Sequence, residues 1–186
     1  MEELKLYMIL IGCTPPGRHT EQHDTYFDIG HNLKELVPRM QAFWPEAQGK
    51  IHLDGWREIK EADGCSVKVV SKETPVTESG YKLFFLNLGG YKENEFEEFH
   101  YKIVVACKDK GVAVNKAKAT AFYKHTGFTG ATSHIDDKYG IDVDDIFEIA
   151  DILPAAVKEK YKLVVEPAAH TQQDIINLGY FKIDKL

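Results

Sequence analysis

The sequence predicts an α+β fold made of two tandem β-β-α-β-β units, with mostly antiparallel strands, helices on one face and a pseudo-twofold relation between the units. Two observations predict it. The motif Glu-x-His occurs twice, at Glu21–His23 and Glu98–His100, and an apolar run ending in glycine precedes each copy. Short hairpins or single helices join the predicted strands, which favours antiparallel pairing. The predicted boundaries are 1–72 for the first unit, 80–150 for the second and 151–186 for a C-terminal extension, all within one globular body.

The two predicted units align without a gap over their first strands. A shift of 77 residues places Lys5 on Lys82, Gly12 on Gly89, Glu21 on Glu98 and His23 on His100. After small insertions, His52–Asp54 aligns with His134–Asp136. Self-similarity at a fixed period is the signature of a repeated structural unit, so we predict an internal duplication.

The first unit shows the expected elements in order. Apolar runs predict strands over 5–12, 24–30, 50–56 and 67–70. In the second strand, Phe27 and Ile29 are expected on one face and Tyr26 and Asp28 on the other. Apolar residues at helical spacing predict an amphipathic helix over 33–44, with Asn32 as its N-cap.

The second unit and the extension repeat this pattern less clearly. The expected strands are 81–89, 101–107, 132–140 and 146–149, with a helix over 111–125. The extension predicts a short helix after Pro154, a strand over 161–166, a helix opened by Thr171 and a last strand over 180–184.

Composition and charge exclude several classes of function. The net charge of −6 and the lack of adjacent basic residues predict no nucleic-acid partner. The first apolar run, 6–11, is too short for a membrane span and follows acidic residues, so no membrane association is expected. Three widely spaced cysteines indicate a reducing, cytoplasmic location. Self-association through an exposed strand edge remains open.

The repeated polar residues are the candidate site. Residues at i and i+2 of a strand share a face, so each Glu-x-His and His-x-Asp presents two polar groups together. Three interpretations remain open: structural ties of neighbouring loops, a pocket for a small polar molecule, or a metal site that activates water. The sequence contains no H-E-x-x-H, C-x-x-C or phosphate-binding glycine motif, and the identity of any cofactor is left open. The candidate binding residues are Glu21, His23, His52, Asp54 and Trp56 in the first unit and Glu98, His100, His134 and Asp136 in the second.

The segment from Lys5 to Ile59 also resembles a known family. Its order of "EQHD", then "FWPEA", then "HLDGWREI" resembles the bacterial domain of unknown function 1543, in which the unit occurs in one or two copies. The second unit departs from the pattern, because Tyr101 follows its histidine and Lys138 stands in place of Trp56. The resemblance implies a small soluble bacterial protein and no particular activity.

Together these observations favour a non-catalytic or small-molecule-binding duplicated module. The alternative is a metal-dependent enzyme, similar to a hydrolase, that uses Glu21, His23, His52 and Asp54.

Overall fold

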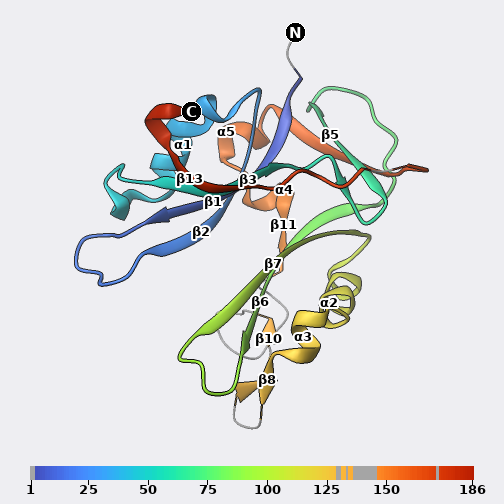
Figure 1. Ribbon diagram of the computed structural model, residues 1–186. Helices are drawn as coiled ribbons and strands as arrows, with labels where there is room; N and C mark the ends of the chain where they lie inside the picture. Colours follow the sequence, from blue (N-terminus) through green and yellow to red (C-terminus); the bar gives the residue numbers. More distant parts are fainter. Residues whose placement is uncertain (1–2, 129–130, 133, 136–145, 171) are drawn as a thin grey trace.

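The first of the sheets contains four strands in the order β13-β3-β1-β2, and all neighbouring strands in it are antiparallel. The computed structural model describes residues 3–128, 131–132, 134–135, 146–170 and 172–186 (Figure 1). The strands are β1 (Lys5–Cys13), β2 (Gln22–Gly30), β3 (His52–Glu58) and β13 (Asn177–Lys182).

Helix α1 (Leu33–Phe43) covers one face of this sheet. Asn32 caps it by accepting a hydrogen bond from the Glu35 amide at 3.2 Å, as the sequence predicts. Its buried Leu36 and Met40 pack in one cluster with alternate residues of β1 and β2, among them Ile9 and Tyr26. Phe27 and Ile29 belong to a different cluster, which confirms the predicted division of faces in β2. A short 3-10 helix, η1 (Pro45–Ala47), leads from α1 toward β3.

The second sheet is built around β6 (Lys82–Tyr91). Its partners are all antiparallel: β7 (Glu98–Cys107), β10 (His134–Ile135) and β11 (Phe147–Glu148). Helices α2 (Lys110–Lys118) and α3 (Ala121–His125) lie beside β6 and β7 in Figure 1, and α2 buries Ala113, Val114 and Ala117 against them. The short strands β8 (Gly127–Phe128) and β9 (Ala131–Thr132) pair with each other.

A third sheet joins the middle of the chain to its end. It has the order β12-β5-β4, with β4 (Glu61–Ala62), β5 (Cys65–Ser71) and β12 (Tyr161–Pro167). Two short helices, α4 (Ile149–Ile152) and α5 (Ala155–Lys158), lead from β11 to β12, and η3 (Ile183–Lys185) ends the chain. Two elements of the extension, β12 and β13, therefore pair with strands of the first predicted unit.

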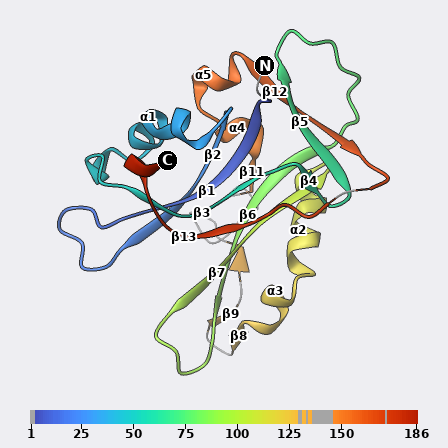
Figure 2. The same ribbon diagram turned by 45° about the horizontal axis from the view of Figure 1, so that its top comes forward.

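A central hydrophobic cluster joins all three sheets. It contains Leu6 and Phe27 from the first sheet, Phe85 from the second and Val67 and Val165 from the third. The rings of Phe27 and Phe85 meet edge to face, with centroids 5.1 Å apart. From this centre the hairpins β1–β2 and β6–β7 diverge, as Figures 1 and 2 both show.

The register of the two hairpins is the same when residue numbers are shifted by 77. Lys5 pairs with Gly30 and Lys82 with Cys107, and the shift holds for every pair from there to Cys13–Gln22 and Gly90–Phe99. The third strands also correspond. Gly12 pairs with His52 and Gly89 with His134.

The α+β class and the mostly antiparallel pairing are confirmed, whereas several predicted elements differ. The expected fourth strand at 146–149 is strand only over Phe147–Glu148. This short strand pairs with β6 at the positions that correspond to those where the end of β3 pairs with β1. It therefore takes the place of the third strand of the second unit rather than the fourth. The expected helix over 111–125 is split, because Thr120 caps a new helix by accepting from the Tyr123 amide.

The predicted helix after Thr171 is wrong, because residues 172–176 have no regular secondary structure. Asp174 in this segment accepts a hydrogen bond from the Lys60 amide at 3.0 Å, which holds the segment against the start of the third sheet. A local helical pattern is outweighed here by a tertiary contact.

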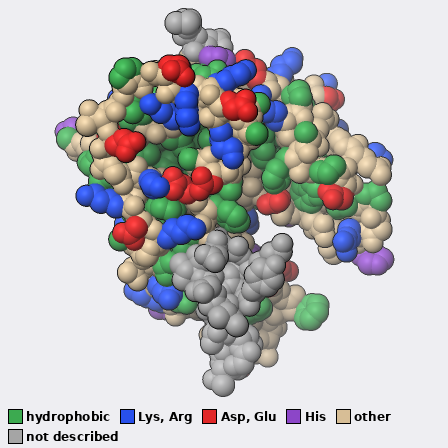
Figure 3. Space-filling model, turned by 180° about the vertical axis from the view of Figure 1, so that it is seen from behind, with side chains coloured by type: hydrophobic (Ala, Val, Ile, Leu, Met, Phe, Trp, Pro, Cys, Tyr) green, Lys and Arg blue, Asp and Glu red, His purple; other side chains and the backbone are tan. Residues whose placement is uncertain are grey.

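The surface and helices bear on possible partners. Figure 3 shows Lys and Arg side chains interspersed with Asp and Glu on the face seen from behind, so the charge there is mixed. Among the described residues, every helix is too short or too polar to cross a membrane.

Candidate functional site

The four polar residues predicted in the first unit meet at one end of the first sheet. His52 Nε2 lies 3.0 Å from Glu21 Oε1 and 3.2 Å from Asp54 Oδ2. His23 Nε2 lies 3.3 Å from Asp54 Oδ2 and 3.6 Å from Glu21 Oε2. We call Glu21, His23, His52 and Asp54 the polar cluster.

Strand register brings the two histidines together. Gly12 of β1 pairs with His23 on one side and with His52 on the other, so the two imidazoles flank a residue without a side chain. A Cβ on Gly12 would lie 2.3 Å from Asp54 Oδ2 and 2.5 Å from His52 Nε2. The polar cluster therefore occupies the space that glycine leaves open.

A β-bulge places Asp54 in the cluster. In the β1–β3 pairing, Leu10 faces Gly55 and Ile11 faces Leu53, so Asp54 is the extra residue. The β3–β13 register shifts at the same point, between Leu178 and Phe181. This shift leaves Tyr180 out of the ladder, and its ring lies over the ring of His52 with centroids 4.3 Å apart.

The polar cluster has a buried side and an open side. The side chain of His52 is only 9% exposed, whereas those of Glu21 and His23 are 43% and 41% exposed. His52 Nε2 and Asp54 Oδ2 are both buried and make no hydrogen bond with any described residue. Both atoms lie close to other members of the polar cluster, but the donor and acceptor directions are poorly aligned. Each atom can therefore still form a hydrogen bond with another group.

The thiol of Cys13 lies near the polar cluster and is buried. Burial raises the pKa of Cys13, and the charge of Glu21 raises it further, so the group stays protonated at neutral pH. Cys13, Cys65 and Cys107 are all buried.

The donor set includes the residue types that bind metal ions. In their present positions, however, the described residues form no group of three or more His, Cys, Asp or Glu side chains arranged to hold a metal ion.

The equivalent residues of the second unit are only partly placed. His100 pairs with Gly89, and Glu98 accepts a hydrogen bond from the Tyr91 hydroxyl at 2.5 Å. His134 pairs with Gly89 through its backbone. Asp136 lies outside the described residues.

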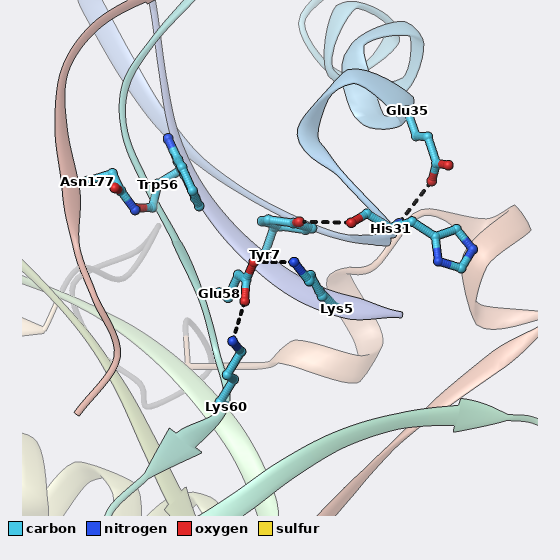
Figure 4. Close-up of polar contacts among 8 residues, drawn as sticks. All are labelled: Lys5, Tyr7, His31, Glu35, Trp56, Glu58, Lys60 and Asn177. Atoms are coloured by element: carbon cyan, nitrogen blue, oxygen red, sulfur yellow. Dashed lines mark hydrogen bonds and ion pairs between the residues drawn. The ribbon is translucent and has the colours of Figure 1, made fainter. Parts of the chain in front are cut away.

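Trp56 lies away from the polar cluster. Its ring packs against Tyr7, with centroids 6.2 Å apart, in the hydrophobic cluster beneath α1. Figure 4 shows it beside Asn177, whose amide donates to the Trp56 carbonyl at 3.4 Å.

Figure 4 also shows an ion-pair network that sequence reasoning missed. Glu58 accepts from Lys5 at 2.7 Å and pairs with Lys60 at 2.6 Å. A matching pair, Lys82 and Glu148 at 2.8 Å, joins β6 to β11. The alignment of Lys5 with Lys82 was the available signal, but an insertion hid the relation between the two glutamates.

Two cavities lie near β3. One, of about 440 Å³, is lined by Trp56, Glu58, Lys60, Asp174 and Asn177 among others. The other, of about 420 Å³, lies between the first sheet and β7 and includes Arg57 and Thr25. Sequence reasoning named neither, because both depend on how the 172–178 segment crosses β3.

The chain is similar in fold to a solved structure. The crystal structure of a protein Il1583 from Idiomarina loihiensis superimposes with a TM-score of 0.59 over 96% of this chain and 97% of that one. The identity of 21% supports a common fold alone. No curated protein matches the sequence.

A family model matches the part of the chain that carries the polar cluster. The matched residues, 18–69, contain all four of its members and the whole of α1. The match confirms the resemblance seen in the sequence: residues 18–69 are similar to the family described as Domain of Unknown Function (DUF1543).

Proposed function

We propose that the protein is a duplicated module that binds a small molecule at the polar cluster. The observation that carries this proposal is the pair of buried atoms, His52 Nε2 and Asp54 Oδ2, that lack hydrogen bonds within the described chain. Buried polar atoms are nearly always satisfied, so a bound group is the simplest partner for them.

The composition of the cluster indicates the kind of ligand. Two carboxylates converge on it, and a neutral imidazole can accept a hydrogen bond through Nε2. A ligand group that donates several hydrogen bonds and carries positive charge, such as a protonated amine, matches this set. Glu21 and His23 are the exposed members, so such a group would enter from their side.

The duplication is supported by pairing rather than by sequence alone. The His–Gly–His row, His23–Gly12–His52, corresponds in backbone pairing to His100–Gly89–His134. The pairs Lys5–Glu58 and Lys82–Glu148 also correspond. Two tandem β-β-α-β units account for these matches. In this arrangement β5 continues the first unit and β12 continues the second, and β5 and β12 pair with each other.

A thermal-shift screen of small primary amines and amino acids tests the proposed function. At least one compound should raise the melting temperature of the wild-type protein and have no effect on His23→Ala. His19→Ala is the matched control, because His19 lies exposed in the loop just before β2, and its removal should leave the shift unchanged. If no compound shifts the wild type, or all variants respond equally, the cluster is only a structural tie.

A metal-dependent hydrolase is the second candidate. The separations of 3.0–3.6 Å between cluster atoms are close to the ligand–ligand spacing of about 3.3 Å that follows from tetrahedral bonds of about 2.0–2.1 Å to zinc. The side chains would have to rearrange first, because they form no metal-binding group as they stand among the described residues. Metal analysis of protein purified without a histidine tag separates the candidates, since only the hydrolase requires near-stoichiometric zinc, manganese or iron.

A further inference from the structure

The cavity between the first sheet and β7 contains a basic side chain that has no direct partner among the described residues. We call it the inter-sheet cavity. Its volume of about 420 Å³ falls within the range of small-molecule sites, about 300–1,000 Å³. Most of its lining is apolar, and its floor and walls include Met8, Leu10, Val104, Ile176 and Leu178.

Two cationic residues, Lys102 and Arg57, line this cavity, and Arg57 is the one that β3 contributes. It pairs with Met8 across β1 and β3, which places both side chains on the sheet face toward β7. Arg57 makes no hydrogen bond or ion pair within the described residues. Burial lowers the pKa of Arg57, and Asp174, Tyr101 and Glu61 act on it only as more distant charges. The five donors of this half-buried guanidinium have no protein partner among the described residues, so water or a bound anion must satisfy them, and an anion also supplies the counter-charge.

A second polar group faces the same space. Thr25 lines the inter-sheet cavity, and its hydroxyl is buried and has no hydrogen-bond partner among the described residues. An apolar cavity with a few polar groups that lack protein partners is the usual form of a ligand site.

We propose that the inter-sheet cavity binds an amphipathic organic anion, whose carboxylate pairs with Arg57 and whose apolar body lies along Met8, Leu10 and Val104. Arginine suits this role because its planar fork matches a carboxylate with two parallel hydrogen bonds. The Thr25 hydroxyl supplies a further donor.

The corresponding position in the second sheet differs. Phe147 pairs with Phe85 as Arg57 pairs with Met8, so the second unit has a phenyl group where the first has a guanidinium. We therefore assign this anion site to the first unit alone. The inference is independent of the function proposed for the polar cluster, although Thr25 and His23 lie two residues apart on β2.

Titration calorimetry with octanoate tests the proposal, with octanamide as the neutral probe of the same shape. The wild-type protein should bind octanoate about tenfold or more tightly than octanamide, because the amide lacks the charge that Arg57 recognises. Arg57→Gln should reduce octanoate affinity by a similar factor. Arg18→Gln removes a charge from the exposed β1–β2 loop and should have no effect.

Two further measurements keep the outcome clear. Thr25→Val preserves side-chain shape and should weaken octanoate binding several-fold, so it replaces Arg57→Gln if that variant does not fold. His23→Ala should leave octanoate binding unchanged, which separates this site from the polar cluster. Equal affinity for octanoate and octanamide, or no binding of octanoate at millimolar concentration, would overturn the proposal.

Discussion

At the scale of single residues, the most deeply buried acidic side chain among the described residues is one whose face the sequence predicts but whose partner it does not. Asp28 is completely buried. It accepts hydrogen bonds from the Tyr26 hydroxyl at 2.8 Å and from Arg39 Nε at 2.7 Å. Alternation along β2 predicts the face that Asp28 shares with Tyr26. Only the packing of α1 shows that Arg39 reaches it.

The buried pair makes a direct prediction for Arg39→Ala. The variant leaves the Asp28 carboxylate buried without its counter-charge, so the free energy of unfolding should fall by about 3–5 kcal/mol. Arg39→Lys should recover only part of the loss, because the guanidinium also donates to the Ile29 carbonyl at 3.0 Å. Urea unfolding followed by circular dichroism measures both values.

Lys34→Ala is the control for this prediction. Lys34 lies exposed on the same helix, so its removal should change the unfolding free energy by less than about 0.5 kcal/mol. A loss below about 1 kcal/mol for Arg39→Ala would mean that water or Tyr26 compensates the buried charge.

At the scale of elements, strands were more predictable than helices and connections. The strands around Gly12 and Gly89 follow from apolar runs whose residues are buried on both faces of the sheet. The meeting of His23 with His52 was predicted as a possibility from the i and i+2 spacing of each pair. The bulge at Asp54 and the position of the Tyr180 ring over His52 could not be predicted. Both depend on the register of β13, which lies over a hundred residues away in sequence.

The contact between β1 and β3 predicts a pH dependence. Burial works to raise the pKa of Glu58, but hydrogen bonds from Lys5 and Lys60 outweigh it, so the pKa lies below its usual value. A lowered pKa in the folded state stabilises the fold above the unfolded value of about 4.3, and this contribution is lost as the pH falls through the folded pKa. Glu58→Gln should therefore cost about 0.5–1 kcal/mol at pH 7 and nothing near pH 2.

Chemical denaturation of the wild type and Glu58→Gln from pH 7 to pH 2 gives this comparison. Glu93→Gln, in the exposed β6–β7 loop, should show no difference at any pH. A gap between wild type and Glu58→Gln that persists at pH 2 would indicate a packing effect of the substitution rather than the ion pair.

At the scale of the whole molecule, the two predicted units are not independent bodies. Their boundaries are predicted from the repeat alone, and the extension crosses back, since β12 pairs with β5 and β13 pairs with β3. Local patterns cannot predict such crossings, because an edge strand is compatible with any partner of suitable register. The central cluster that contains Phe27 and Phe85 joins the units further.

This arrangement predicts that the chain unfolds as one cooperative unit. The two tryptophans, Trp44 and Trp56, both lie in the first unit, so their fluorescence reports its unfolding, while far-UV circular dichroism reports the whole chain. Phe85→Ala removes a buried ring from the second unit and should cost about 3–5 kcal/mol. Because Phe85 contacts Phe27 across the units, the tryptophan transition should shift as far as the circular dichroism transition does. Phe96→Ala, at a fully exposed loop position, should shift neither transition. A tryptophan transition that stays in place while the circular dichroism transition moves would show that the two halves unfold separately.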